Sequence, residues 1–391
     1  MLKFLFLFWG VGVMAGPENK ISTETLDKAL EALAGEETAG RQSGAPGAAL
    51  ARQWLVSWLE DHSVRPAGSE AGSYEQAFDG GINILGILDP AGSKGKEPVV
   101  MLGAHYDHTG TNCRAHALAA SLTCNGAADN AAGVAAVLAA AETLSSQLKQ
   151  PIALCFWDME ERGLKGSIFF AKNPSFPTGS LHLYINLDII GLNLFKGLES
   201  SHFALASETG GPALIKDLTA AAADAGLKIR KLSYGFGHNR SDMTSFVVKG
   251  YALPIVFFTD GDGGAYHSTA DELSLINRDK VARIAQTMVF LSQRAAAGGG
   301  AYSYRKPDYS GFFNAMPSDV PVMHDLINAV IDVASDNNLA AQHVADLTTL
   351  RDRLEKFRGQ DPPELGVPEK QVLLESILGL IKLSKGLSVL P

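Results

Sequence analysis

The sequence predicts an α/β fold, in which apolar strands alternate with helices around a largely parallel sheet. Short apolar runs recur along the chain up to residue 258, as buried strands do. Segments with helical spacing separate several of these runs, and strands that are joined through helices pair in parallel. The chain has 391 residues, of which 46% are hydrophobic, so it has room for one large domain with a smaller appendage or for two domains.

Two helices are expected before the sheet begins, at residues 22–34 and 48–61. In the first, Leu26, Leu30 and Leu33 recur at helical spacing, and the second has a comparable apolar face. A loop rich in small residues, 35–47, separates the two. Neither helix carries obvious catalytic groups, so we expect both to pack over the sheet.

The strands and helices that follow define the sheet itself. The predicted strands are 82–88, 98–105, 151–158, 181–188, 203–206 and 254–258. The predicted helices are 126–148, 211–225 and 277–294. The last of these helices should close a main domain that spans residues 16–298.

Residues 299–391 are predicted to form a C-terminal helical extension. A Gly-rich linker, 295–300, precedes amphipathic helical segments at 320–358 and 369–385. Charged residues interrupt the apolar pattern after residue 373, which favours a packing helix over a membrane segment. The extension shows no catalytic constellation.

Residues 1–15 are typical of a secretory signal peptide, because one Lys precedes a short apolar run and a cleavage site of small residues. Export to the periplasm or the medium, with no stable membrane insertion after cleavage, is therefore expected. An oxidising compartment favours a disulfide between Cys113 and Cys124, which share one polar loop. Cys155 lies inside an apolar strand and should be a buried, inert thiol. The net charge of −9 argues against a nucleic-acid partner.

Two adjacent carboxylates, Glu160 and Glu161, follow the strand at 151–158. The carboxyl ends of strands are where open α/β sheets place their chemistry. Buried carboxylates without a partner are costly, so the pair needs either a metal ion or a shared proton. The two explanations are open at this point, and the remaining potential ligands decide between them.

Other strand ends and loops supply further imidazole and carboxylate groups. These are His105 with Asp107, Asp129, Asp188 and His267. Alone, each is more often a structural residue or a helix cap. Together they suit zinc, and there are more of them than one ion needs. Two ions that share a bridging carboxylate would use the set, leaving one Glu free as a general base.

The same residues lie in motifs that resemble those of the M28 family of dinuclear zinc aminopeptidases. The motifs, in the order of the family, are Gly-Ala-His-Tyr-Asp at 103–107, Gly-Ala-Ala-Asp-Asn-Ala-Ala-Gly at 126–133, Trp-Asp-Met-Glu-Glu-Arg-Gly at 157–163, Asn-Leu-Asp-Ile-Ile-Gly at 186–191 and Tyr-His-Ser-Thr-Ala-Asp at 266–271. This resemblance, to zinc exopeptidases of the bacterial leucyl aminopeptidase type, implies a three-layer α/β/α domain with a central mixed, mostly parallel sheet.

The resemblance also implies a role for each residue of the set. His105 and Asp188 would bind one zinc ion, Glu161 and His267 the other, and Asp129 both. A cis peptide would join Asp129 to Asn130. Asp107 would hold the outer nitrogen of His105, and Glu160 would be the general base.

Weaker candidates surround this set. Arg240 would bind polar groups of the substrate, and Tyr266 would donate its hydroxyl to the oxyanion. His108, His116 and His238 are additional ligand candidates. Two departures from the family, Met243 in place of a His and the Cys-bearing loop at 109–125, leave substrate preference open.

The expected function is hydrolysis of N-terminal peptide bonds in peptide or aminoacyl substrates, with two Zn²⁺ ions per chain. A glutaminyl cyclase, which uses one zinc ion on the same fold, is one alternative. A carboxypeptidase or another amidohydrolase is a second. A non-catalytic binding protein should have lost ligands, and none is missing here.

Overall fold

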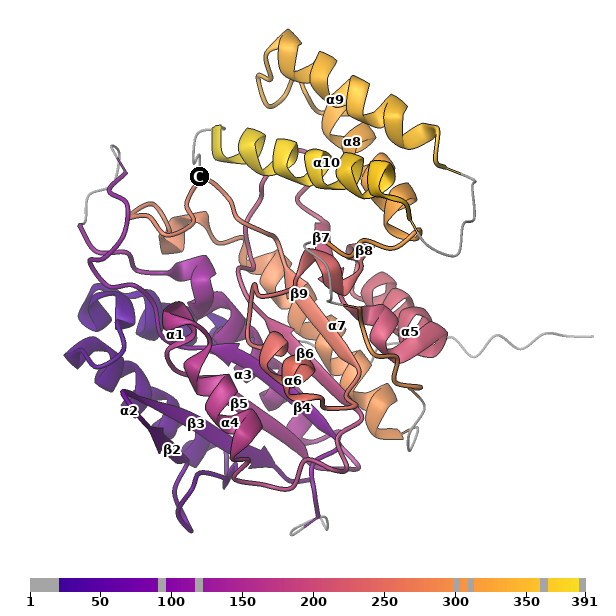
Figure 1. Ribbon diagram of the computed structural model, residues 1–391. Helices are drawn as coiled ribbons and strands as arrows, with labels where there is room; N and C mark the ends of the chain where they lie inside the picture. The colour runs from indigo at the N-terminus through magenta and orange to yellow at the C-terminus, as the bar shows by residue number, and fades with distance from the viewer. Residues whose placement is uncertain are drawn as a thin grey trace, which may run out of the picture.

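The computed structural model describes residues 21–90, 96–116, 122–297, 302–308, 313–358 and 365–386. Within them, one mixed sheet of nine strands is flanked by helices, with further helices after it (Figure 1). The predicted signal peptide lies outside the described residues. No helix in these ranges is long and apolar enough to span a membrane.

The four central strands of the sheet pair in parallel, and antiparallel pairs join them to the strands on either side. The strands are β1 (Arg65–Pro66), β2 (Glu75–Phe78), β3 (Gly81–Leu88), β4 (Val100–His105), β5 (Ile152–Trp157), β6 (Leu183–Leu187), β7 (Ser201–Leu205), β8 (Lys228–Leu232) and β9 (Ile255–Thr259). Their spatial order is β1-β3-β5-β4-β6-β9-β7-β8, with β2 beside β3. Strands β5, β4, β6 and β9 run parallel, whereas β3 and β7 run antiparallel to β5 and β9. The predicted mixed, mostly parallel sheet is confirmed.

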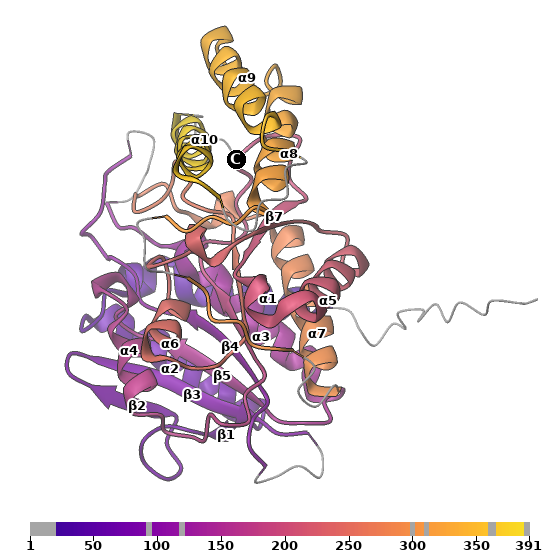
Figure 2. The same ribbon diagram turned by 45° about the vertical axis from the view of Figure 1, so that its right-hand side comes forward.

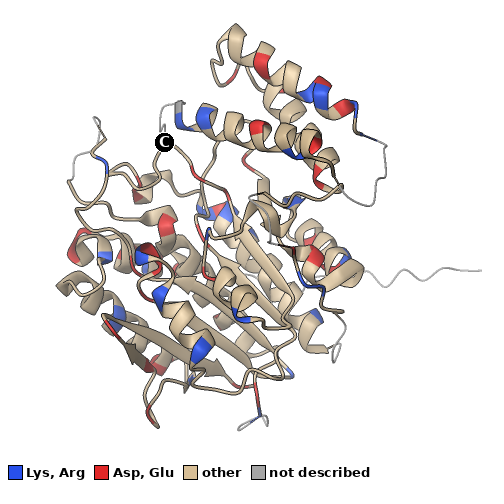
Figure 3. Ribbon diagram, viewed as in Figure 1, with Lys and Arg blue, Asp and Glu red and all other residues tan. Residues whose placement is uncertain are grey.

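The four parallel strands are buried along their whole length. Both faces of a parallel sheet are covered, so such strands consist of nearly continuous apolar residues. Figure 3 shows the central strands free of charged residues, which lie on helices and loops instead. The short strand β8 was not predicted, because its sequence Lys-Ile-Arg-Lys-Leu is half charged and forms no apolar run.

Two helical layers enclose the sheet (Figure 2). Leu102 and Leu154 point into one core cluster and their strand neighbours Met101 and Cys155 into another, because successive side chains alternate between faces. The first cluster is covered by α1 (Thr23–Ala34), α2 (Pro46–Asp61), α3 (Ala132–Ser145), α5 (Gly211–Asp224) and α7 (Arg278–Ala297). The second is covered by α4 (Lys165–Lys172) and α6 (Met243–Lys249). The three-layer prediction is confirmed.

The extension contains α8 (Asp319–Asp332), α9 (Ala341–Glu355) and α10 (Val367–Gly386). It packs beside β7 and β8, at the top of Figure 1, and shares the second core cluster. The segment 320–358, expected to be helical throughout, is two helices with a turn between them. A polar run ending in Asn337 and Asn338 causes the break, and Asn338 takes a left-handed φ of 52°. The predicted linker at 295–300 lies partly in α7 and partly outside the described residues.

The predicted disulfide between Cys113 and Cys124 is present, and Cys155 is a buried free thiol as expected. The disulfide loop contacts the segment after β9 through its backbone. The backbone N–H of Arg114 donates to His267 O at 3.0 Å, and that of Thr269 donates to Arg114 O at 3.0 Å. The loop therefore lies beside one of the predicted metal ligands.

Candidate metal centre

Three of the parallel strands end beside one another and bring their acidic and imidazole groups together. His105 is the last residue of β4, and Asp188 directly follows β6. Glu160 and Glu161 form the short helical turn η4 (Glu160–Arg162) after β5. Because β5, β4 and β6 are neighbours with the same direction, these four side chains meet at one edge of the sheet.

Asp129 reaches the same edge from the helical turn η3 (Ala127–Ala131), which leads into α3. The carboxylate of Asp271 holds this turn, accepting hydrogen bonds from the backbone N–H groups of Ala128 at 2.8 Å and Asp129 at 3.0 Å. Asn130 donates its side-chain amide to Leu187 O at 2.8 Å. The peptide bond between Asp129 and Asn130 is cis, as the family resemblance implied.

A first group of potential metal ligands consists of His105, Asp129 and Asp188. One ligand atom from each lies within 4.8 Å of the others. The Nε2 atom of His105 is 3.3 Å from Asp129 Oδ1 and 3.3 Å from Asp188 Oδ1. All three side chains are buried.

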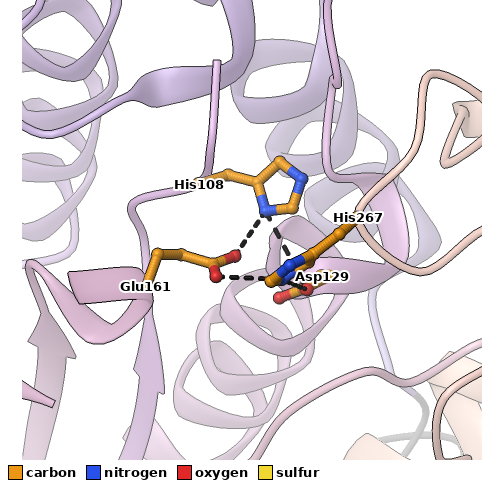
Figure 4. A group of neighbouring side chains, drawn as sticks. All are labelled: His108, Asp129, Glu161 and His267. Atoms are coloured by element: carbon orange, nitrogen blue, oxygen red, sulfur yellow. Dashed lines mark hydrogen bonds and ion pairs between the residues drawn. The ribbon is translucent and has the colours of Figure 1, made fainter. Parts of the chain in front are cut away.

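A second group consists of His108, Asp129, Glu161 and His267, again within 4.8 Å (Figure 4). His267 Nε2 lies 2.9 Å from Glu161 Oε2 and 3.3 Å from Asp129 Oδ2. His108 Nδ1 lies 2.8 Å from Glu161 Oε1 and 3.9 Å from Asp129 Oδ2. Asp129 thus belongs to both groups, with Oδ1 facing one and Oδ2 the other.

The electrostatics of the two groups fit divalent cations. Burial lowers the pKa of His267, but the hydrogen bonds that its ring donates to Asp129 and Glu161 outweigh this effect and raise the pKa to about 10. Burial likewise lowers the pKa of His105, and nearby carboxylates, Asp188 foremost, raise it well above its usual value. The carboxylates therefore require positive charge between them. Imidazole and carboxylate donors in this number suit Zn²⁺.

Asp107 contacts both a potential ligand and the predicted base. Its Oδ1 atom lies 3.5 Å from His105 Nδ1, and its backbone carbonyl lies nearer, at 3.1 Å. The same Oδ1 atom accepts a hydrogen bond from the backbone N–H of Glu160 at 3.1 Å. Ser43 donates its hydroxyl to the other carboxylate oxygen at 3.1 Å. Asp107 therefore links the ends of β4 and β5.

Glu160 lies beside the first group without belonging to it. Burial raises the pKa of its carboxyl well above the usual value; nearby His105 opposes this effect, and the carboxylates Asp188, Asp242 and Glu161 add to it. A base whose pKa is raised from the ordinary carboxyl range is better matched to proton transfer near neutral pH.

Arg240 and Tyr266 both reach the hollow in front of these groups. Arg240 donates to Asp262 Oδ2 at 2.6 Å, so its charge is already paired. The ring of Tyr266 stacks on that of His267, with centroids 3.9 Å apart. Burial and the nearby Asp129 raise the pKa of the Tyr266 hydroxyl, so it keeps its proton and can act as a donor.

His108 was only a weak candidate from the sequence, yet it is the nearest partner of Glu161 in the second group. The signal was its place directly after the His-Tyr-Asp motif, which puts it past the end of β4 beside the ligands. His116 and His238, which the sequence ranked alongside it, belong to neither group among the described residues.

Nothing in the sequence pointed to Arg41 as part of the site, although this residue supports the turn that carries Asp129. Its guanidinium is fully buried and donates to the carbonyls of Tyr106, Asn125 and Gly126 at 2.9, 2.6 and 2.9 Å. Burial lowers its pKa to about 10, so the group is still charged at neutral pH. Gly126 begins the turn that carries Asp129, and Arg41 therefore ties this turn to the N-terminal segment.

A hollow of about 1200 Å³, including space open to solvent, adjoins the two groups. Asp129, Glu160 and Asp188 line one end of it. Its remaining walls are largely apolar. A substrate bound in this hollow would have its reacting bond beside the carboxylates and imidazoles.

Comparisons with known proteins agree with this arrangement. The model of peptidase family M28 matches residues 83–292, which is more than half of the chain. This range contains every predicted ligand, from His105 to His267. No curated protein sequence matches the chain.

Several solved structures share the fold. Glutaminyl cyclase from Porphyromonas gingivalis is 19% identical, with a TM-score of 0.54 over 69% of this chain and 97% of that one. The LapA aminopeptidase of Legionella pneumophila is 17% identical, with a TM-score of 0.54 over 71% and 72%. A Zn-dependent exopeptidase from Parabacteroides distasonis is 20% identical, with a TM-score of 0.53 over 68% and 97%. On the match of its sequence to the family model, the chain belongs to peptidase family M28.

Proposed function

We propose that this protein is a zinc-dependent aminopeptidase that removes the N-terminal residue from peptides. The observation that carries the proposal is the position of Asp129, whose two carboxylate oxygens face two separate groups of ligands. A carboxylate shared in this way suits a pair of metal ions. The similarity to aminopeptidases and a Zn-dependent exopeptidase supports zinc and hydrolysis.

The residues would divide between two Zn²⁺ ions. His105 and Asp188 would hold one ion, Glu161 and His267 the other, and Asp129 both. We propose that His108 completes the second group, because its Nδ1 atom points at Glu161 and Asp129. When bound, the ions supply positive charge that lowers the pKa of a water molecule and polarises the scissile carbonyl.

Glu160 is the proposed general base. Its carboxylate takes a proton from the attacking water as the water oxygen bonds to the carbonyl carbon. It then gives this proton to the amide nitrogen as the C–N bond breaks, so the products are a free amino acid and a shortened peptide. The raised pKa of Glu160 supports both transfers. Asp107 positions this residue through its bond to the Glu160 backbone N–H.

Tyr266 and Arg240 are proposed to contact the substrate. The Tyr266 hydroxyl donates to the oxyanion that develops on the carbonyl oxygen, where a preorganised donor is most effective. Arg240 is held by Asp262 at the wall of the hollow, where it can bind a polar group of the peptide. The carboxylates of Asp129, Glu160 and Asp188, which line the hollow, favour a free α-ammonium group, which accounts for cleavage at the N-terminus.

Glutaminyl cyclase activity is a second candidate function, because two of the structural neighbours with this fold are glutaminyl cyclases. A cyclase would need only one zinc ion. The second group, with its two imidazoles and Glu161, favours the two-ion hydrolase.

Peptides with one modified end test the proposal. The zinc-loaded protein should release the first residue of an unblocked peptide and of its C-terminal amide, and should leave the N-acetylated peptide intact. A peptide that begins with Gln should yield free Gln. Cleavage of the N-acetylated peptide from its C-terminus would identify a carboxypeptidase, and a pyroglutamyl product would identify a cyclase.

Export is also proposed. The support is the N-terminal sequence at 1–15 together with the disulfide between Cys113 and Cys124, since disulfides persist in oxidising compartments. We therefore propose that the protein acts in the periplasm or outside the cell. Mass spectrometry of the protein secreted or released from the periplasm should find a chain that begins after residue 15.

A further inference from the structure

The hollow beside the metal groups is walled from two sides by different parts of the chain. The main domain provides one side through residues of the β6–β7 connection and of the sheet. The C-terminal extension provides the other, through Leu326 of α8 and four residues of α10, namely Ile377, Leu380, Ile381 and Ser384. The family match ends at residue 292, before these helices begin.

Polar contacts attach the extension to the main domain at both ends of α8. The buried carboxylate of Asp319, at the start of α8, accepts the backbone N–H of Ser233 at 2.8 Å and its hydroxyl at 2.6 Å. Beyond the other end of α8, Asn337 exchanges two hydrogen bonds with the backbone of Lys196 at 2.8 and 2.9 Å.

The last turns of α10 contact the loop between β9 and His267. Lys385 Nζ lies 3.8 Å from Asp262 Oδ2 and 5.6 Å from the ring centre of Tyr266. Ser384 donates its hydroxyl to Asp262 O at 3.5 Å. These contacts hold the end of α10 next to Tyr266, whose ring stacks on that of His267.

The interior of the hollow is apolar away from the metal groups. Its apolar lining includes Leu194, Phe203, Phe236, Ile377 and Ile381. Arg240 and Asp262 line it too, and they form an ion pair at 2.6 Å. The charged residues Asp260 and Lys280 also line it, but they pair with each other at 2.5 Å. His202 adds a second partner to Asp260 at 2.7 Å. The inner walls therefore favour an apolar group rather than a charged one.

We propose that α8 and α10 form one wall of the pocket for the first side chain of the substrate, and that this pocket selects large apolar residues. The proposal deepens the aminopeptidase function and rests on it. Asp129, Glu160 and Asp188 line the same hollow, so a scissile carbonyl beside them directs the attached side chain toward the apolar walls. Phe203, Phe236 and Phe257 line the hollow, so a large apolar side chain would bury more apolar surface there than Ala would.

Substitutions at a lining and at an exposed position of α10 test the proposal. Ile377→Trp fills the hollow, whereas Leu378→Trp is a matched control, because Leu378 is 55% exposed and does not line it. We expect Ile377→Trp to lower kcat/KM for Phe and Leu aminoacyl substrates by about tenfold or more while the Ala substrate changes little. Leu378→Trp should leave all three within about twofold of wild type. Ile381→Asp, which adds a charge to the same wall, should give the same selective loss.

Calorimetric binding of Phe amide and Ala amide to the zinc-loaded proteins separates this proposal from the proposed function. If wild type hydrolyses none of the substrates but binds Phe amide, and Ile377→Trp removes that binding, the apolar pocket stands and the aminopeptidase assignment fails. If wild type hydrolyses all substrates and both Ile variants keep its preference, the pocket proposal is wrong. An equal loss for Phe and Ala in folded Ile377→Trp, judged by circular dichroism, would also overturn it.

Discussion

The Nδ1 atom of His108 lies 2.8 Å from Oε1 of Glu161, and the whole His108 side chain is buried. Its other ring nitrogen, Nε2, is buried without a hydrogen-bond partner in the described structure. The Nδ1 atom also lies 3.9 Å from Asp129 Oδ2, so this nitrogen faces two carboxylates, an arrangement that suits ligation of a cation. This position is the basis for our proposal that His108 joins Asp129, Glu161 and His267 in holding a metal ion.

His108→Ala should therefore weaken the binding of one of the two zinc ions by at least about tenfold and leave the other ion bound. Competition with a zinc-chelating dye, followed on the purified protein, measures both affinities. The His108→Gln variant distinguishes ligation from simple hydrogen bonding, because a Gln amide can still donate to Glu161. Full recovery of zinc affinity in His108→Gln would contradict ligation by His108.

Glu160→Gln should keep both zinc ions and lose nearly all turnover, because the amide cannot accept and return a proton. The expected loss in kcat is on the order of 100-fold to 10,000-fold. Metal analysis and kinetics on the same sample check the two parts together. Glu161→Gln is the matched neighbour, and it should lose zinc as well as activity. Near-normal turnover in the Glu160 variant would refute its role as the base.

Arg41→Met should destabilise the fold and the metal centre together. The change leaves the carbonyls of Tyr106, Asn125 and Gly126 without their buried donor, each of which costs about 1–3 kcal/mol. Urea unfolding should show a loss of several kcal/mol, with weaker zinc binding. Arg283→Met is a suitable control, because its side chain is 43% exposed and its ion pair should contribute less than about 1 kcal/mol. Equal effects of the two substitutions would contradict the supporting role of Arg41.

The folded chain should lose stability as pH rises from 4.5 to about 7. Burial raises the pKa of Glu208 from 4.5 to about 7, although the Tyr234 backbone N–H opposes it, and Asp319 of α8 adds to the rise. Since the folded chain binds this proton more tightly than the unfolded chain, the stabilisation is fully present below pH 4.5. It is lost between pH 4.5 and about 7, by an amount on the order of 3 kcal/mol.

Glu208→Gln removes the titrating group and keeps an oxygen that can accept from Tyr234. Urea unfolding of this variant should match wild type near pH 4.5 and exceed it above pH 7. Glu31→Gln, at an exposed site on α1, should follow wild type at every pH. If wild type and Glu208→Gln differ by a constant amount across this range, Glu208 does not titrate in the window stated.

Much of the centre of the fold could be predicted because its determinants are local. β4, β5, β6 and β9 are apolar runs that end in His105, the Glu160 pair, Asp188 and the loop to His267. Because such strands pair in parallel, the sequence alone predicts that their carboxyl ends lie side by side. β8 and α6 were missed because one carries charges along an edge position and the other is only seven residues long.

Contacts between distant segments were not predictable from periodicity. His108 was ranked low because one imidazole after Asp107 does not show whether it points inward or outward. Arg41 acts through backbone carbonyls, which leave no trace in the sequence. The part of the hollow that Ile377 lines depends on how α10 packs against the main domain, although the helix itself was expected.

Stepwise zinc addition is the most direct test of the proposal that the protein is a hydrolase in which Asp129 would serve two zinc ions. Protein stripped by chelation is titrated with zinc while release of the first residue from an unblocked peptide is followed. The two-ion proposal predicts no release without metal, full activity at two equivalents per chain, and no release from the N-acetylated peptide. Full activity in the stripped protein, or a plateau at one equivalent with a pyroglutamyl product from a Gln peptide, would contradict it.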